Sequence, residues 1–383
     1  MTIRLFDRDV TALDFTATVL ECIPRGDSYE VVLDQTAFFP EGGGQGADHG
    51  TLGGANVLDA QEKGGVIRHT TDAPLTVGSS VEGHVEPVRR LSMMQQHTGE
   101  HILSGLICRL HGYHNVGFHI GTEAVTLDFN GPLTEDQVRH VEQLANEFIW
   151  RDLPVEAWIP SPEELAALDY RSKKAIDGDV RIVRIPGADT CACCGTHVLT
   201  TGQVGQIKVI GVMKYKGGVR LSILCGMRAL EAENALLEEN RAVSQALSAK
   251  PGELASATRR LLQERDELRL KCEQTGMQLF RLLAEKQEGE KVRIVPADML
   301  APSQLRKAAG MLAEGCRFGL ALIPRGEGWS FALCSTAEDV RPAAQQLNQR
   351  FGGKAGGPRD MVQGVLASGS VAEMRALLEA FVP

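Results

Sequence analysis

The sequence predicts an α+β protein of several domains, in the order small β-barrel, α+β metal-binding domain, helical hairpin or coiled coil, and α/β domain. Short β-rich runs separated by Gly, Asp and Pro fill the first 87 residues, a pattern typical of a small barrel. Residues 228–290 are instead rich in Leu, Glu, Arg and Gln, as long helices are. The 383 residues, 43% of them hydrophobic, suffice for two or three packed domains.

The composition indicates a soluble protein with reduced cysteines. Its nine cysteines are irregularly spaced, and the N-terminus lacks the apolar run of a signal peptide. No stretch approaches the roughly eighteen consecutive apolar residues of a membrane helix. The net charge of −9 argues mildly against a nucleic-acid coat protein, but residues 300–383 carry nine Lys and Arg against seven Asp and Glu. We therefore expect a cytoplasmic protein whose C-terminal part contacts phosphates.

Residues 1–87 are predicted to form the barrel. The segments 15–22 and 29–34 alternate in polarity or are rich in β-branched residues, as strands are. A glycine run leading to Gln45 lets the backbone approach another surface closely, although a flexible hairpin loop is an equal alternative. Gly43, Gly44 and Gln45 also match the tripeptide of peptide-release factors, which hydrolyse a related ester, but three residues do not identify that family.

A helix with two histidines opens the next predicted domain, residues 88–227. Apolar residues recur with helical periodicity over about 88–112. His97 and His101 lie at i and i+4, which places both imidazoles on one face within reach of one metal ion. The remaining elements are predicted as a strand over 116–130, a helix over 135–150, mixed structure over 155–185, a loop over 187–197, and strands over 204–211 and 218–225.

A second pair of metal-binding side chains lies in the predicted loop. Cys193 and His197 are four residues apart around Gly195, so both can turn toward the same point. Nitrogen and sulfur donors favour Zn²⁺ over magnesium or calcium, which prefer oxygen. The two histidines of the helix and this pair together predict one composite zinc site.

Residues 228–290 are predicted to be helical, with a break at Lys250-Pro251-Gly252. The break favours an antiparallel hairpin. Leu254, Leu261 and Leu268 are spaced by seven residues, which suits an intermolecular coiled coil equally well.

Residues 291–383 are predicted to form a separate α/β domain. A glycine-rich loop over 352–360 contains Lys354 and Arg359. Basic residues among glycines suit a loop that binds phosphate; the alternative is a flexible connection. The predicted elements are strands over 292–295, 318–323 and 329–334, and helices over 302–313, 340–351 and 371–381.

Two motifs resemble a known family. His97-Thr98-Gly99-Glu100-His101 and Cys193-Cys194-Gly195-Thr196-His197 are similar to the H-x-x-x-H and C-x-G-T-H pair of the alanyl-tRNA editing domain, found in alanyl-tRNA synthetase and in freestanding editing proteins of the AlaX type. The resemblance spans most of residues 1–230 and includes the stretches 38–45, with Asp48 and Gly50, and 117–121, leading to Leu127-Asp128-Phe129. Cys194 stands where the family usually has glycine, which adds a rival ligand beside Cys193. The loop over 352–360 resembles the signature of the DHHA1 domain, which is implicated in tRNA binding and association.

The resemblance implies a long-form trans-editing deacylase. Synthetase relatives carry an activation domain before this homology, whereas here it begins at residue 1, so we expect ester hydrolysis without ATP rather than aminoacylation. The implied substrate is seryl-tRNA(Ala), with glycyl-tRNA(Ala) as a weaker expectation. The implied partners are tRNA(Ala) and a second copy of the chain, joined through the helical or C-terminal region.

Roles for individual residues follow as expectations. His97, His101, Cys193 and His197 would hold the zinc, and Glu100 is the candidate general base. Gly43, Gly44, Gln45, His119 and Thr122 are expected to contact the aminoacyl end, and Lys354 and Arg359 the tRNA. Four protein ligands usually mark a structural zinc, whereas a catalytic zinc keeps one coordination position open. Three alternatives follow for a catalytic site: one ligand is weakly bound, the coordination number increases, or the metal mainly positions substrate.

Two other classes of protein fit parts of the pattern. His97-x-x-Glu100-His101 also matches the H-x-x-E-H motif of inverzincin metallopeptidases, whose third ligand is a distant glutamate. A closed four-ligand shell equally suits a non-catalytic, zinc-stabilised protein that binds tRNA or dimerises.

Overall fold

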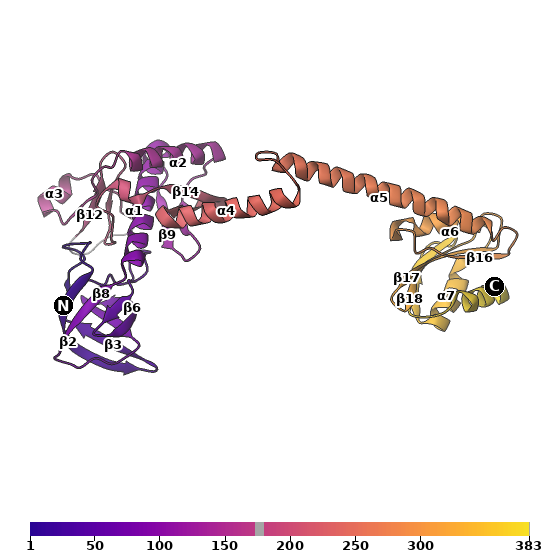
Figure 1. Cartoon of the computed structure of the whole chain (residues 1–383), viewed down its shortest axis with the longest axis horizontal. Coiled ribbons are helices and arrows are strands. Elements are labelled where there is room, and N and C mark those ends of the chain that lie inside the picture. Colours follow the sequence, from indigo (N-terminus) through magenta and orange to yellow (C-terminus); the bar gives the residue numbers. More distant parts are fainter. Residues whose placement is uncertain (173–179, 383) are drawn as a thin grey trace. The chain divides into compact units, whose positions relative to one another are not determined.

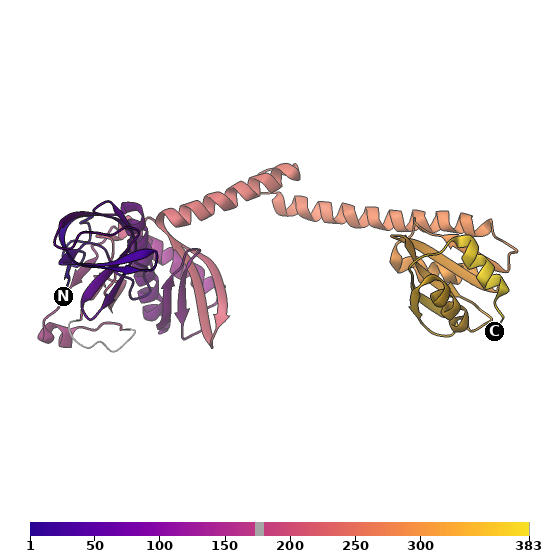
Figure 2. The same ribbon diagram turned by 90° about the horizontal axis from the view of Figure 1, so that it is seen from below.

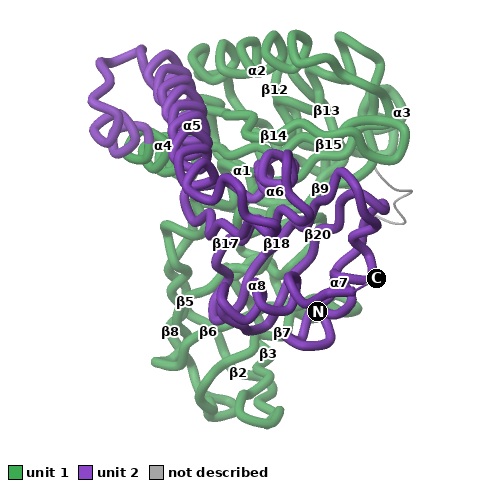
Figure 3. The backbone as a smooth tube through the Cα atoms, turned by 90° about the vertical axis from the view of Figure 1, so that its right-hand side faces the viewer, with its two compact units in different colours: residues 1–239 green, residues 240–383 purple. Residues whose placement is uncertain are grey.

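The computed structural model describes residues 1–172 and 180–382, which divide into two compact units, residues 1–239 and 240–383. Figure 1 shows the elements along the chain, and Figure 3 colours the two units separately. Within the described residues, no helix is long and apolar enough to cross a membrane. The prediction of an α+β protein with several parts is confirmed.

A closed six-stranded barrel forms the N-terminal part, as predicted. Its strands alternate between inward and outward side chains; in β7, for example, Ile67, His69 and Thr71 are buried and their neighbours are not. A short parallel pair, β1 (Ile3–Arg4) with β4 (Gln35–Thr36), lies outside the barrel. Around the barrel the order is β2 (Asp14–Arg25), β3 (Ser28–Leu33), β7 (Val66–Thr71), β6 (Ala55–Lys63), β5 (Gly50–Leu52) and β8 (Ser80–Val85).

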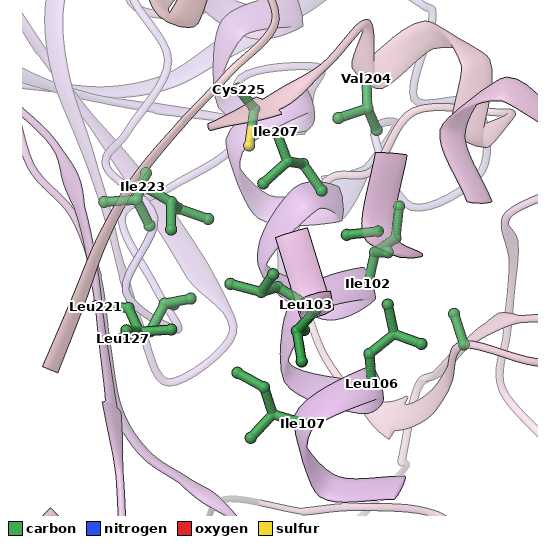
Figure 4. Close-up of a cluster of buried hydrophobic side chains, with 14 of the residues drawn as sticks. Ile102, Leu103, Leu106, Ile107, Leu127, Val204, Ile207, Leu221, Ile223 and Cys225 are labelled. Carbon is green, nitrogen blue, oxygen red and sulfur yellow. The ribbon is translucent and has the colours of Figure 1, made fainter. Parts of the chain in front are cut away.

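Helix α1 (Pro87–His111) is the central element of the domain that follows. Proline at its first turn and the left-handed Gly112, whose N–H bonds the carbonyl of Cys108, set its two ends. Every residue from Gln96 to Ile107 is buried, because other elements cover the helix all round. Figure 4 shows its apolar side chains, including Leu103 and Ile107, packed among residues of the neighbouring sheet.

A four-stranded sheet packs against this helix, in the order β14 (Ile207–Tyr215), β15 (Gly218–Cys225), β10 (Val125–Phe129), β9 (Asn115–Ile120). The single strand predicted over 116–130 is wrong: β9 and β10 are antiparallel, and the Gly121 N–H bonds the Ala124 carbonyl at the reversal. Polarity alternates through both strands, so the pattern hides the turn. Helix α2 (Glu135–Trp150) matches its prediction and begins with a capping box between Thr134 and Gln137.

A smaller sheet leads to the predicted ligand loop. It consists of β11 (Glu156–Trp158), β12 (Ile182–Ile185) and β13 (Asp189–Ala192). Helix α3 (Pro162–Ala167) lies between β11 and β12 in the chain, and the 3₁₀ turn η1 (Thr201–Val204) follows β13. Part of the predicted mixed segment, residues 173–179, lies outside the described residues. Strand β13 ends immediately before Cys193 and so delivers the second half of the predicted metal site.

Two helices follow, α4 (Gly226–Ala246) and α5 (Leu254–Glu285), and the predicted break at Lys250-Pro251-Gly252 lies between them. The division between the compact units falls within α4. A hairpin or an intermolecular coiled coil therefore stays a prediction. The C-terminal end of α5 lies against the domain that follows (Figure 2). Met277 and Phe280 of this helix are buried in a core cluster of that domain.

The C-terminal domain is a five-stranded sheet with helices. Its strand order is β16 (Val292–Pro296), β17 (Phe318–Arg325), β18 (Gly328–Cys334), β20 (Met361–Leu366), β19 (Gly353–Gly356), and its helices are η2 (Pro302–Gln304), α6 (Leu305–Ala313), α7 (Val340–Phe351) and α8 (Val371–Ala380). The predicted glycine loop is partly an edge strand. Gly353 suits this edge strand because a Cβ there would lie 2.3 Å from the Val365 carbonyl oxygen of β20, so the two backbones require close approach.

Candidate metal centre

Four side chains converge where helix α1 meets the loop after β13. The donor atoms of His97, His101, Cys193 and His197 all lie within 4.8 Å of one another. Cys193 Sγ is 3.4 Å from Nε2 of both His97 and His197. The three imidazoles are at most 3% exposed. The structure therefore brings together the four residues that the sequence predicts as ligands.

A different group holds the Nδ1 atom of each imidazole. Gln45 Oε1 lies 2.8 Å from Nδ1 of His97, Asp189 Oδ2 lies 2.8 Å from Nδ1 of His101, and Thr98 Oγ1 lies 3.2 Å from Nδ1 of His197. With Nδ1 engaged, each ring presents Nε2 to the centre of the cluster. Three imidazole nitrogens and one sulfur are a donor set that fits zinc.

The charges of the cluster also suit a metal. Burial lowers the pKa of His197 to about 3, so its imidazole is neutral at neutral pH. Burial alone would raise the pKa of the Cys193 thiol, but the neighbouring imidazoles of His97 and His101 hold that pKa well below its usual value. Burial also opposes the charge on His101, yet Cys193, Glu100 and Asp189 raise its pKa well above the usual value. Zinc would bind the Cys193 thiolate and displace the proton of His101.

The loop that carries Cys193 is fitted tightly against His97. A Cβ at Gly195 would lie 2.1 Å from Cε1 of His97, so only glycine fits there. Arg181 donates to the carbonyls of Cys193 and Gly195, at 3.0 and 2.9 Å. Cys194 is exposed and is not a member of the cluster. The geometry therefore favours Cys193 over its neighbour as the sulfur donor.

The glycine run of the barrel reaches this cluster. Gln45 is fully buried, and besides His97 it contacts Thr196, through Oε1 to the backbone N–H and through Nε2 to Oγ1. The Gly44 carbonyl accepts from Ile120 N–H at 2.8 Å, and a Cβ on Gly44 would collide with Phe118. Gly43, in contrast, has open space around its Cα. Gln45 thus contacts the two halves of the cluster through His97 and Thr196, and its contact with substrate stays a prediction.

Glu100 lies beside the cluster rather than in solvent. The carboxylate is fully buried, and its Oε1 accepts from Ser104 Oγ and Asn115 Nδ2, both at 2.7 Å. Its Oε2 lies 3.7 Å from Nε2 of His101. A role as general base remains a prediction, and this position is compatible with it.

The other predicted contact residues are exposed. His119 lies on β9 one residue after Phe118, whose ring centroid is 4.9 Å from that of His97, so His119 points to the opposite side of the strand. Thr122 lies in the turn after β9, and its carbonyl accepts from Arg228. Strict recognition of a substrate hydroxyl needs a buried hydrogen-bonding group, and neither side chain is buried. Lys354 and Arg359 are exposed in the second compact unit.

Sequence reasoning missed the groups behind the ligands, namely Thr98, Asp189 and Arg171. Thr98 lies within the histidine motif, and Asp189 precedes Cys193 by four residues, but nothing in the sequence connects Arg171 to the site. Asp189 and Arg171 also border a cavity of about 790 Å³ whose lining includes none of the four cluster residues. This cavity therefore lies behind His101 rather than over the donor atoms.

Comparison with known proteins relates 94% of the chain to one group of enzymes. Residues 6–89 match the family model "tRNA synthetases class II (A)", and residues 180–222, which include Cys193 and His197, match "Threonyl and Alanyl tRNA synthetase second additional domain". Alanine–tRNA ligase from Natronomonas pharaonis is 32% identical over 392 residues, which cover 94% of this chain and 41% of that protein. The Pyrococcus abyssi enzyme is 31% identical over 385 residues, with the same two coverages.

The chain thus spans about two fifths of the length of these curated relatives. Among solved structures, the C-Ala domain from Aquifex aeolicus alanyl-tRNA synthetase aligns with 24% of this chain and 86% of its own, at 17% identity and a TM-score of 0.21.

Proposed function

We propose, from the premise that this chain is related to the editing and C-terminal domains of alanyl-tRNA synthetases, that it is a zinc-dependent aminoacyl-tRNA deacylase. Its proposed substrate is tRNA(Ala) mischarged with serine, with glycyl-tRNA(Ala) as a second substrate. The reaction is hydrolysis of the ester between the amino acid and the terminal adenosine.

The observation that carries this proposal is the convergence of His97, His101, Cys193 and His197 within 4.8 Å. These residues would hold zinc, which supplies a Lewis acid for the ester carbonyl and lowers the pKa of water. Gln45, Asp189 and Thr98 orient the three imidazoles. Glu100, held by Ser104 and Asn115, is the proposed acceptor of the proton from the attacking water.

Specificity would come from the serine hydroxyl. An alanine pocket cannot firmly exclude glycine or serine, so a second site is needed to remove the errors. A group that bonds the hydroxyl is left unpaired by alanine, which costs roughly 1–3 kcal/mol when that group is buried. His119 and Thr122 are the proposed contacts. Since both are exposed in the free protein, the proposal requires that bound tRNA cover them.

These contacts are tested by His119→Leu and Thr122→Val. Either change should lower the ratio of seryl- to alanyl-tRNA(Ala) hydrolysis while zinc content stays at the level of the unmutated protein. Unaltered selectivity in both variants would reject these two residues and leave the deacylase proposal standing.

A second candidate function is a zinc-stabilised tRNA-binding protein without catalysis. Four protein donors are enough to complete a tetrahedral shell, which is the usual arrangement of structural zinc. The metallopeptidase class fits less well, because the cluster found in the described part of the chain contains no glutamate, which inverzincins use as third ligand.

One experiment separates the three classes. The protein is incubated with seryl-tRNA(Ala), glycyl-tRNA(Ala), alanyl-tRNA(Ala) and a peptide mixture, with chelator and after zinc is restored. We expect zinc-dependent release of serine, slower release of alanine, and intact peptides. Binding of tRNA without release of any amino acid would instead favour the non-catalytic protein. Cys193→Ala should abolish release and Cys194→Ala should not, which makes the neighbouring cysteine a matched control.

A further inference from the structure

Asp189 joins the metal cluster to an arginine that belongs to no recognised motif. Its Oδ2 lies 2.8 Å from Nδ1 of His101. Arg171 approaches the same carboxylate with two donors, Nε to Oδ1 and Nη2 to Oδ2, both at 2.7 Å. The Asp189 side chain is 2% exposed and that of Arg171 is 15% exposed. The carboxylate is thus buried between an imidazole and a guanidinium, in a geometry with little freedom.

The three imidazoles are therefore held by groups of different strength. An amide supports His97 and a hydroxyl supports His197, and the hydroxyl oxygen is shared with the Val198 N–H at 3.2 Å. Only His101, among the three, is supported by a carboxylate. A carboxylate behind a ligating imidazole fixes the ring and makes its other nitrogen more basic, which strengthens the bond to a metal.

Arg171 also holds the strand that ends at Cys193. Its backbone N–H donates to the Thr190 carbonyl, and its own carbonyl accepts from the Ala192 N–H, both at 2.9 Å. The segment around Arg171 therefore forms a parallel bridge along β13, opposite Cys191. One residue thus contacts both the partner of His101 and the strand that delivers the sulfur donor.

We propose that Arg171 and Asp189 form a clamp that makes His101 the most firmly held histidine ligand of the metal, and that His197 is the ligand that yields most readily. The inference rests on the zinc site of the proposed function. Arg171 and Asp189 are positioning residues, because they act on the metal only through His101 and β13. Because the four donors would hold the metal with unequal strength, the most weakly held donor can leave. Its coordination position then becomes exchangeable.

The clamp is tested by zinc affinity, measured in competition with a chromogenic chelator. Asp189→Asn keeps the shape of the side chain but removes its charge, and should weaken zinc binding about 10- to 100-fold. Arg171→Lys keeps the positive charge but loses the two-pronged contact, and should weaken zinc binding severalfold. The ranking of ligands predicts a larger loss of affinity for His101→Ala than for His197→Ala.

Asp128 offers a matched control. Arg220 contacts it with the same two-pronged geometry, at 2.6 and 2.7 Å, in the same compact unit but with no imidazole behind it. Asp128→Asn should leave zinc affinity unchanged. The absorption spectrum of the cobalt-substituted protein gives a second readout, since a change in the ligand field in Asp189→Asn, absent from Asp128→Asn, reports the metal site itself.

Two results would overturn the clamp. One is wild-type zinc affinity in Arg171→Lys, a mild change that also decides the matter if Asp189→Asn does not fold. The other is an equal loss of affinity in Asp128→Asn and Asp189→Asn, which would mean a general effect on stability. Because zinc affinity is measured without tRNA, failure of the clamp is distinct from failure of the deacylase proposal, which would show as bound zinc without ester hydrolysis.

Discussion

At the residue scale, the contact between Gly195 and His97 decides whether the two halves of the metal site can meet. Gly195→Ala would put a methyl group 2.1 Å from Cε1 of His97, and the overlap should destabilise the folded protein by about 1–3 kcal/mol. We expect purified Gly195→Ala to contain much less zinc than the unmutated protein, as measured by metal analysis. Gly42→Ala is the control, since its nearest neighbour is 3.9 Å away. Full zinc content in Gly195→Ala would contradict this reading of the loop.

The four donors could be predicted from the sequence because their spacing is local within each half: i and i+4 on a helix, and four residues apart around a glycine. Their partners could not. Gln45 reaches His97 across 52 residues of chain, and Arg171 reaches Asp189 from a segment without a motif. Such contacts depend on how the barrel loop and β13 pack against α1, which no local pattern encodes.

At the scale of elements, the barrel contains a buried histidine that links its stability to pH. His69 Nε2 lies 2.9 Å from Thr36 Oγ1, and Nδ1 lies 3.1 Å from the Val31 carbonyl. Burial lowers the pKa of His69 from 6.5 to about 4. The unfolded chain takes up a proton near pH 6.5 and the folded barrel does not. The free energy of unfolding therefore decreases by about 3 kcal/mol as the pH falls from 6.5 toward 4.

Hydrogen exchange of the amides of β3 and β7 measures this loss. The protection factor, which is the intrinsic exchange rate divided by the observed rate, should decrease in the unmutated protein between pH 7 and pH 4.5. In His69→Gln, which carries no titrating group at this position, this decrease should be absent. The same pH dependence in both proteins would show that another group is responsible.

Local periodicity predicted most elements, and it failed where strands reverse. The interval 116–130 alternates in polarity through a turn, so two strands read as one. The stretch 352–360 is rich in glycine, which suggests a loop, yet Gly353–Gly356 pairs with β20. In that strand Gly353 allows the backbone to approach Val365 of β20 closely, and this need is visible only once the partner strand is known.

At the scale of the whole molecule, we propose that tRNA capture and ester hydrolysis belong to different units. Lys354 and Arg359 are exposed in the C-terminal domain, and the ligands lie in the first unit. The double variant Lys354→Gln/Arg359→Gln should weaken tRNA binding and make it less salt-dependent, with the slope of log K against log salt reduced by about 1–2. Its single-turnover rate at saturating enzyme should be unchanged.

Arg341→Gln is the control for that variant, because Arg341 is exposed in the same domain but already paired with Asp339 at 2.5 Å. It should leave both tRNA affinity and salt dependence close to those of the unmutated protein. Equal losses in the control and the double variant would indicate a general effect of charge rather than a phosphate contact at the glycine-rich segment.

The central claim is that the four converging side chains hold a zinc that serves selective ester hydrolysis. Its most direct test is the ratio of the single-turnover rates on seryl-tRNA(Ala) and alanyl-tRNA(Ala), measured in one preparation before chelation, after chelation and after zinc is restored. We predict a ratio well above one, loss of both rates on chelation, and recovery with zinc. Equal rates on the two substrates, or rates that chelation leaves intact, would contradict the claim.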